Sequence, residues 1–213
     1  MKDVDVCRVS AAGGEGPLEA LRRVSPPVLI GEAGWGEAFP CRPLARFRIG
    51  YDAGGLLVFF EVEEGQFRAA EGADGGRVWE DSCVEFFFQP GGEGGYYNFE
   101  CNAAGSLVFA FGEGREGREA APAAVSRLIR RRGGMEVSRG EVSLFRWWML
   151  LEIPFAALFR DRFAAAPGMV SRGNFYKCGD LLAEPHFLSW NPVVAARPDF
   201  HRPECFGRLS FRG

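Results

Sequence analysis

The 213-residue sequence has few of the residues that catalytic and metal sites commonly use. His186 and His201 are its only histidines, which excludes a metal site built from three histidines. Its six cysteines are widely scattered and form no C-x-x-C pair, so the sequence predicts no zinc site, no other metal site and no disulfide scaffold. No phosphate-binding loop opens a helix and no nucleophile elbow is present, so nucleotide chemistry has no support.

Positive charge and long apolar runs are also scarce. Lysine occurs only at positions 2 and 177 and the net charge is −3, so we expect no binding to nucleic acid or to an anionic membrane. The local exception is "RLIRRRGG" (127–134), which predicts a solvated loop or an edge strand. No apolar run approaches the roughly 20 residues that span a bilayer. The start "MKDVDVCRVSAAGG" has no basic region followed by an apolar one, which predicts a cytoplasmic location.

What the sequence does contain is short aromatic and β-branched segments separated by 29 glycines and 13 prolines. This rhythm predicts an all-β chain in one domain over residues 1–213, folded as a two-sheet antiparallel β-sandwich or jelly roll. Short helices are expected over 18–24 and 154–163. Outside the hairpin of the next paragraph, strands are expected over 6–11, 45–52, 56–64, 106–112, 143–154, 170–180 and 206–211.

A hairpin joins "CVEFFFQ" (83–89) to "YYNFECN" (96–102) through the turn-rich "PGGEGG". Pairing Gln89 with Tyr96 puts one apolar set on a single face: Val84, Phe86, Phe88, Tyr97, Phe99 and Cys101. The same register places Glu85 directly opposite Glu100 on the other face, with Asn98 and Asn102. Like charges facing each other across a ladder destabilise it. A shared proton, an arginine, a metal ion or a polyhydroxyl ligand could each offset this repulsion.

Two of the five tryptophans stand in polar, turn-like contexts. These are Trp79 in "RVWEDS" and Trp190 in "LSWNPV", whereas one of Trp147 and Trp148 is expected in the core. An exposed indole flanked by acids and amides suits a flat ligand with a polar rim, such as a pyranose ring. Ordinary packing at the rim of the sandwich is the alternative explanation.

Four segments in order, "VWEDSCVEFFFQP", "YYNFECNAAGSL", "WWMLLEIPFAAL" and "LSWNPVVAARPDFHRPECFGRLSF", resemble the family 9 carbohydrate-binding modules. The resemblance runs from about residue 35 to 211 and is nearest to the small stand-alone bacterial proteins of this type. It implies a non-catalytic β-sandwich of the DOMON-like kind that clamps a mono- or oligosaccharide between two tryptophans. By the family's motifs, those are Trp79 and Trp190, with polar contacts from Glu85 and Asn102.

Departures from the family pattern define further candidates. The family has an arginine where this chain has Glu100, so the resemblance leaves the ligand class open at that position. Glu100, Asn191 and His201 are second candidates for ligand contact. Some relatives bind structural calcium, but no calcium ligand set is recognisable in this sequence.

Two other functions remain open at this stage. One is a carbohydrate-active enzyme, or a subunit of one, that uses Glu85 and Glu100 as a coupled carboxylate pair. The other is an interaction domain whose sugar site has decayed.

Overall fold

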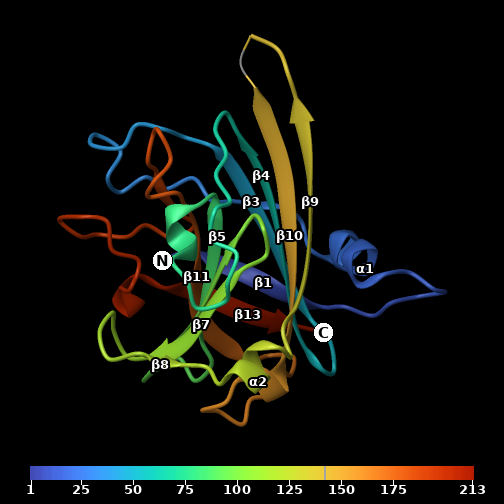
Figure 1. Cartoon of the computed structure of the whole chain (residues 1–213). Coiled ribbons are helices and arrows are strands. Elements are labelled where there is room, and N and C mark those ends of the chain that lie inside the picture. Colours follow the sequence, from blue (N-terminus) through green and yellow to red (C-terminus); the bar gives the residue numbers. More distant parts are fainter. Residues whose placement is uncertain (142) are drawn as a thin grey trace.

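The structure is a computed structural model that describes residues 1–141 and 143–213 (Figure 1). Helices α1 (Pro17–Val24) and α2 (Ala123–Ser126) are short, and the rest is largely β-structure. The strands are β1 (Asp3–Arg8), β2 (Val28–Leu29), β3 (Leu44–Tyr51), β4 (Gly55–Glu64), β5 (Cys83–Gln89), β6 (Tyr96–Asn102), β7 (Leu107–Gly112), β8 (Glu119–Ala120), β9 (Arg130–Ser138), β10 (Leu144–Pro154), β11 (Val170–Cys178), β12 (Phe187–Ser189) and β13 (Gly207–Arg212).

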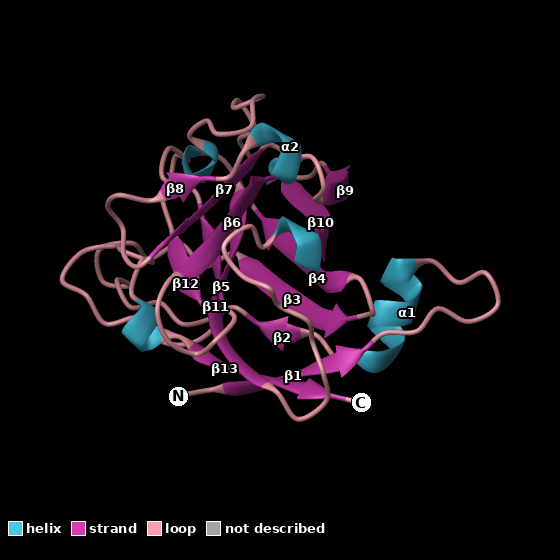
Figure 2. Ribbon diagram, turned by 90° about the horizontal axis from the view of Figure 1, so that it is seen from below, coloured by secondary structure: helices cyan, strands magenta, loops and turns pink. Residues whose placement is uncertain are grey.

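The strands form one hydrogen-bonded path, β8-β7-β6-β5-β11-β13-β1-β3-β4-β10-β9, that curls until its two halves face each other (Figure 2). The rings of Phe47 on β3 and Phe175 on β11 stack across the interior with centroids 3.5 Å apart. The predicted β-sandwich is therefore confirmed. It differs from the expectation in one respect, because β1 pairs in parallel with both β13 and β3 and so joins the two layers.

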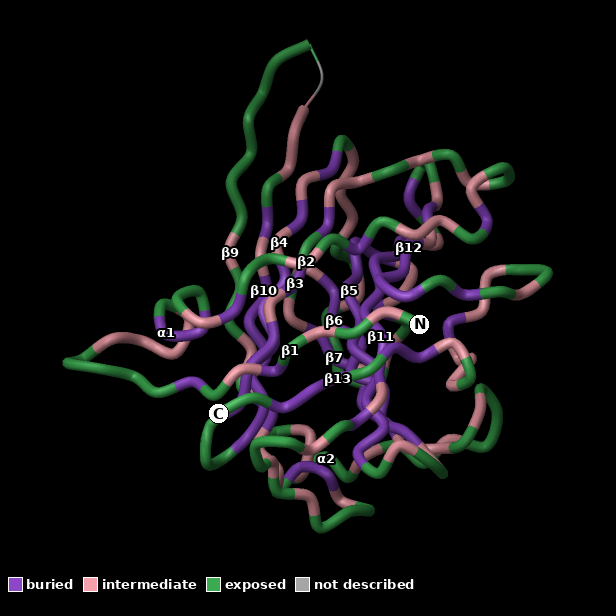
Figure 3. Tube along the Cα trace, turned by 180° about the vertical axis from the view of Figure 1, so that it is seen from behind, coloured by how far each residue is buried: buried purple, intermediate pink, exposed green. Residues whose placement is uncertain are grey.

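Most predicted strands are confirmed to within about three residues at each end. The arginine-rich run ends in β9, an edge strand that is mostly exposed (Figure 3). The helix expected over 154–163 is wrong, because only a 3-10 turn at Phe155–Ala157 forms. Tertiary packing overrides the local preference: Phe159 packs against Tyr97, and Phe163 packs against Phe88. Among the described residues, no helix is both long enough and apolar enough to cross a membrane.

A fully buried ion pair ties the two layers together. Lys177 on β11 places Nζ 3.0 Å from Glu64 Oε2 on β4, and also donates to His186 Nε2 at 2.8 Å. The indole N–H of Trp147 on β10 donates to the other oxygen of Glu64 at 2.6 Å. Burial and the neighbouring ammonium group lower the pKa of His186 to about 3, so the ring is neutral and accepts the lysine proton.

Removing one member of this pair is expected to destabilise the fold strongly. Glu64→Leu leaves the Lys177 charge buried without compensation, a loss of about 3–5 kcal/mol. The double variant Lys177→Met/Glu64→Leu removes both charges and should be more stable than Glu64→Leu alone. Urea unfolding of wild type, Glu64→Leu, Lys177→Met and the double variant measures this. Losses that simply add in the double variant would contradict the coupling.

Candidate functional site

The predicted register of the β5–β6 hairpin is confirmed, because Glu85 pairs with Glu100 and Phe88 with Tyr97. The predicted apolar set all lies in the main core between the layers. The other face is also covered, by the segments around residues 78–79 and 193–206. Both glutamates are therefore nearly inaccessible, with exposed fractions of 3% for Glu85 and 5% for Glu100.

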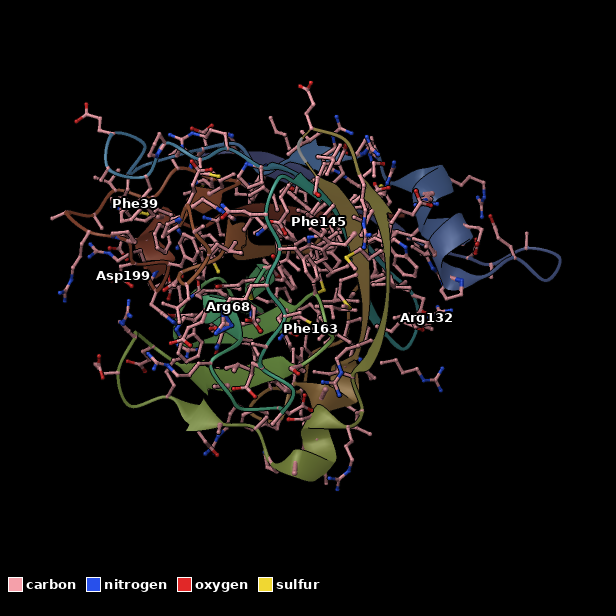
Figure 4. All side chains as sticks on the ribbon, turned by 45° about the horizontal axis from the view of Figure 1, so that its top comes forward. Phe39, Arg68, Arg132, Phe145, Phe163 and Asp199 are labelled. Carbon is pink, nitrogen blue, oxygen red and sulfur yellow. The ribbon has the colours of Figure 1, made fainter. Side chains whose placement is uncertain are left out.

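A cavity of about 370 Å³ opens over these two glutamates. Its walls come from the 3-10 turn Val78–Glu80, from β5 and β6, from the loop before β8, from the end of β11, from β12 and from the C-terminal segment. Figure 4 shows Asp199, one lining residue, on that C-terminal segment at the end of the molecule where Phe39 also lies. The lining residues are Trp79, Glu85, Glu100, Arg115, Glu116, Cys178, Asp180, Phe187, Pro198, Asp199, Phe200 and His201.

Burial shifts three carboxyl groups of the cavity towards their protonated forms. Desolvation raises the pKa of Glu85 well above its usual value, and Cys178 and Glu100 beside it add to the rise. Desolvation also raises the pKa of Glu100 to about 7 and that of Asp180 to about 6. The thiol of Cys178 donates to Glu85 Oε1 at 3.1 Å. Bound protons thus reduce the repulsion between Glu85 and Glu100 that the sequence predicts.

Arginines reach this face from the loop before β8. Arg118 donates to Asn98 Oδ1 at 2.8 Å, and the amide of Asn98 donates to Glu100 Oε1 at 2.8 Å. Arg115 pairs with Asp199 at 3.2 Å on the cavity wall. Positive charge on this face therefore comes from the loop before β8, and Arg118 is linked to Glu100 through the amide of Asn98.

The cavity has one half-buried indole, that of Trp79. Its 3-10 turn folds back beside the end of β11, where Asp180 N–H donates to Trp79 O at 3.0 Å. His201 lies in the same lining, and its Nδ1 is 2.8 Å from the hydroxyl of Tyr96. Burial and nearby arginines lower the pKa of His201 to about 4, so it is neutral.

Trp190 does not reach this cavity. It follows β12, which pairs Phe187 with Cys178 and Ser189 with Tyr176. Alternation along this strand directs Phe187 to the cavity and Trp190 into the core, where its ring packs edge-on against Phe175 with centroids 5.7 Å apart. The ring is 2% exposed, so the structure does not bring the two tryptophans of the expected clamp together.

The two asparagines among the candidates have structural partners. Asn102 lies under the segment after β4, where its amide donates to Asp81 Oδ2 and to Glu71 O, each at 2.8 Å. Asn191 accepts from Lys2 N–H at 2.7 Å and donates to Cys205 O at 2.8 Å. Neither lines the cavity. The structure therefore gathers Trp79, Glu85, Glu100 and His201 and leaves Asn102, Asn191 and Trp190 outside.

Sequence reasoning missed several residues of the cavity, chiefly Cys178, Asp180, Phe187 and Phe200. The signal for two of them was present, since alternation in "YKCGD" puts Tyr176, Cys178 and Asp180 on one face. Only the pairing of β11 with β5 brings that face next to Glu85. The ring of Phe200 reaches the site from an irregular segment by stacking on Tyr176, with centroids 4.1 Å apart.

The fold and this cavity define the class: a β-sandwich with a cavity walled by aromatic and carboxyl groups. The chain belongs to carbohydrate-binding family 9, whose sequence profile matches residues 25–211. A comparison with curated proteins gives no match.

Solved structures agree with this assignment. A candidate carbohydrate-binding protein from Bacteroides uniformis ATCC 8492 is 36% identical, with a TM-score of 0.88 over 99% of both chains. A family 9 carbohydrate-binding module from Caldicellulosiruptor kristjanssonii in complex with glucose has a TM-score of 0.60 at 12% identity, over 100% of this chain and 96% of that one. The cellotriose complex of a family 9 module from the same organism has a TM-score of 0.58 at 12% identity, over 100% and 94%. At this identity the two complexes support the fold alone.

The raised pKa of Glu100 makes the effect of its replacement depend on pH. A carboxyl group whose pKa is higher in the folded than in the unfolded protein stabilises the fold less as pH rises from about 4.5 to about 7. Glu100→Gln should therefore gain about 2–3 kcal/mol relative to wild type between pH 5 and pH 8, measured by urea unfolding. Glu116→Gln, at an exposed position of the same cavity, is the control. An equal gain in the control, or none in Glu100→Gln, would contradict the burial of this charge.

The position of Trp190 predicts a loss of stability on its removal. Trp190→Ala empties a large core volume beside the stacked rings of Phe47 and Phe175 and should cost about 3–5 kcal/mol. Thermal and urea unfolding measure this cost. A variant with unchanged stability would show that the ring is not part of the core.

Proposed function

We propose that the cavity binds a mono- or oligosaccharide, with one sugar ring stacked on Trp79. The observation that carries the proposal is a half-buried indole in the wall of a cavity that also holds Glu85 and Glu100, in a chain of carbohydrate-binding family 9. The C–H face of a pyranose suits an indole surface, while its hydroxyls suit carboxyl groups, which accept and, when protonated, donate. The ring of Phe187 offers a second apolar surface in the same cavity.

The size and polarity of the cavity fit this ligand class. Its volume of about 370 Å³ lies in the usual range of small-ligand pockets, roughly 300–1,000 Å³. Arg115 donates from the wall, Glu85 and Glu100 lie at its base, and His201 is uncharged. Hydroxyl groups that both donate and accept match this mixture better than an anion, which Glu116 and Asp199 in the lining would repel.

The ligands of the relatives suggest which sugars to test first. Glucose and cellotriose are bound in the structures of the Caldicellulosiruptor kristjanssonii modules. We infer that this chain takes sugars of the same chemical class, bound by Trp79, Glu85, Glu100 and His201 in place of the two-tryptophan clamp with its asparagine contact.

Non-catalytic binding is the preferred function over glycoside hydrolysis. Glu85 and Glu100 project side by side from neighbouring strands at the base of the cavity, whereas a hydrolase needs its two carboxyl groups on either side of the scissile bond. Turnover of aryl glycosides by the wild type that is lost in Glu100→Gln would favour the hydrolase.

Calorimetric titration with glucose, cellobiose and cellotriose tests the proposal. Wild type is expected to bind at least one of these sugars saturably. Trp79→Ala is expected to weaken that binding at least about tenfold because the stacking surface is lost, while its unfolding midpoint changes little. The matched control is Trp148→Ala, which removes a half-buried indole that packs on Phe59 away from the cavity. Failure of the wild type to bind any sugar, or equal weakening in both variants, would leave the fold in place and reject this site.

A further inference from the structure

Two cysteines that are remote in the sequence meet at the base of the cavity. Strand β11 pairs with β5 so that Cys178 lies directly opposite Cys83. Both side chains point to the cavity side of the sheet, where Cys83 and Cys178 pack in the same buried cluster. Glu85 is two residues along β5 on the same face, and its Oε1 is 3.1 Å from Cys178 Sγ.

The three side chains form the geometry of a ligand set. One potential ligand atom from each of Cys83, Glu85 and Cys178 lies within 4.8 Å of the other two. In a tetrahedral zinc site with bonds of about 2.3 Å to sulfur and about 2.0–2.2 Å to oxygen, ligand atoms are about 3.5–3.8 Å apart. The 4.8 Å limit on the distances within the cluster is about 1 Å above that spacing.

We propose that Cys83, Cys178 and Glu85 bind a thiophilic divalent cation of the zinc class, with its fourth coordination position open to the cavity. Two sulfur ligands select such a cation over calcium or magnesium, which prefer oxygen. Binding displaces the thiol protons, and that of Glu85 where it is present, to solvent. The fourth position is then free for water or for a ligand hydroxyl, as in open zinc sites.

The surroundings favour a cation at this point. Besides Glu85, four acidic residues line the cavity, namely Glu100, Glu116, Asp180 and Asp199, against one arginine, Arg115. Glu85 also faces Glu100 across the ladder, so a bound cation would take the place of a proton in offsetting the repulsion between them. Access is available, because Cys178 and Glu85 both line the cavity and Cys83 is adjacent to them.

Sequence motifs do not predict this site, for a physical reason. The expectation of no zinc site rested on the lack of a C-x-x-C pair, which brings two thiols together on one loop. Here the pairing of two strands does the same for residues on separate segments. The inference does not depend on sugar binding, because its ligands and its test involve the metal alone.

Cobalt(II) titration tests the site, because a cobalt–thiolate bond gives an ultraviolet charge-transfer band and four-coordinate cobalt gives strong visible bands. The protein is first reduced with a phosphine, so that a disulfide between Cys83 and Cys178 does not remove the ligands. We expect one cobalt per chain with thiolate charge transfer, displaced by zinc. Both spectroscopic signals should be lost in Cys83→Ser and in Cys178→Ser. In Glu85→Gln, the affinity for cobalt should fall at least about tenfold.

The matched control is Cys101→Ser, which changes a buried cysteine of the same hairpin on the opposite face of the sheet. It should keep the wild-type spectrum. A second measurement guards against misfolded variants, since zinc should raise the unfolding midpoint of wild type and Cys101→Ser but not of folded Cys178→Ser. Absence of a thiolate band in the wild type, or a band that survives Cys83→Ser or Cys178→Ser, would overturn the proposal.

Discussion

The pairing of Glu85 with Glu100 on two adjacent, fully buried strands is the constraint around which this end of the molecule is built. The apolar faces of β5 and β6 must point between the layers, so the acidic positions must point the other way. That second face is covered by the Trp79 turn and the C-terminal segment, which removes most water from the carboxyl groups. The repulsion that follows is offset by bound protons, as the raised pKa of both groups indicates.

Much of the surrounding structure holds this arrangement in place. On the inner side, Lys177 and Glu64 fix β11 against the facing layer, so the strand that carries Cys178 stays aligned with β5. On the outer side, Asn98 and Arg118 orient Glu100. A rigid sandwich thus presents polar groups at the base of a cavity whose aromatic walls come from turns and loops, a division of roles common in binding proteins.

Alternation allowed the sandwich, the hairpin register and the Glu85–Glu100 pair to be predicted from sequence, because a one-residue slip would expose the apolar face. The same rule fails at Trp190, because the sequence around it resembles a turn but forms the short strand β12. Alternation along β12 directs the indole inward and Phe187 outward. The motif match at Asn102 identifies a buried residue, but its partners Asp81 and Glu71 are set by tertiary folding. Contributions from Cys178 and Phe200 depend on strand pairing and loop placement, which no local pattern specifies.

We propose that a saccharide occupies the cavity above Glu85 and Glu100, and a crystal structure of the protein grown with cellotriose tests this most directly. We expect one sugar ring against the indole of Trp79, with hydroxyl groups within hydrogen-bonding distance of Glu85 or Glu100 and with Trp190 still buried. A sugar bound at another surface, or a Trp190 ring turned out of the core to hold it, would rule out this site.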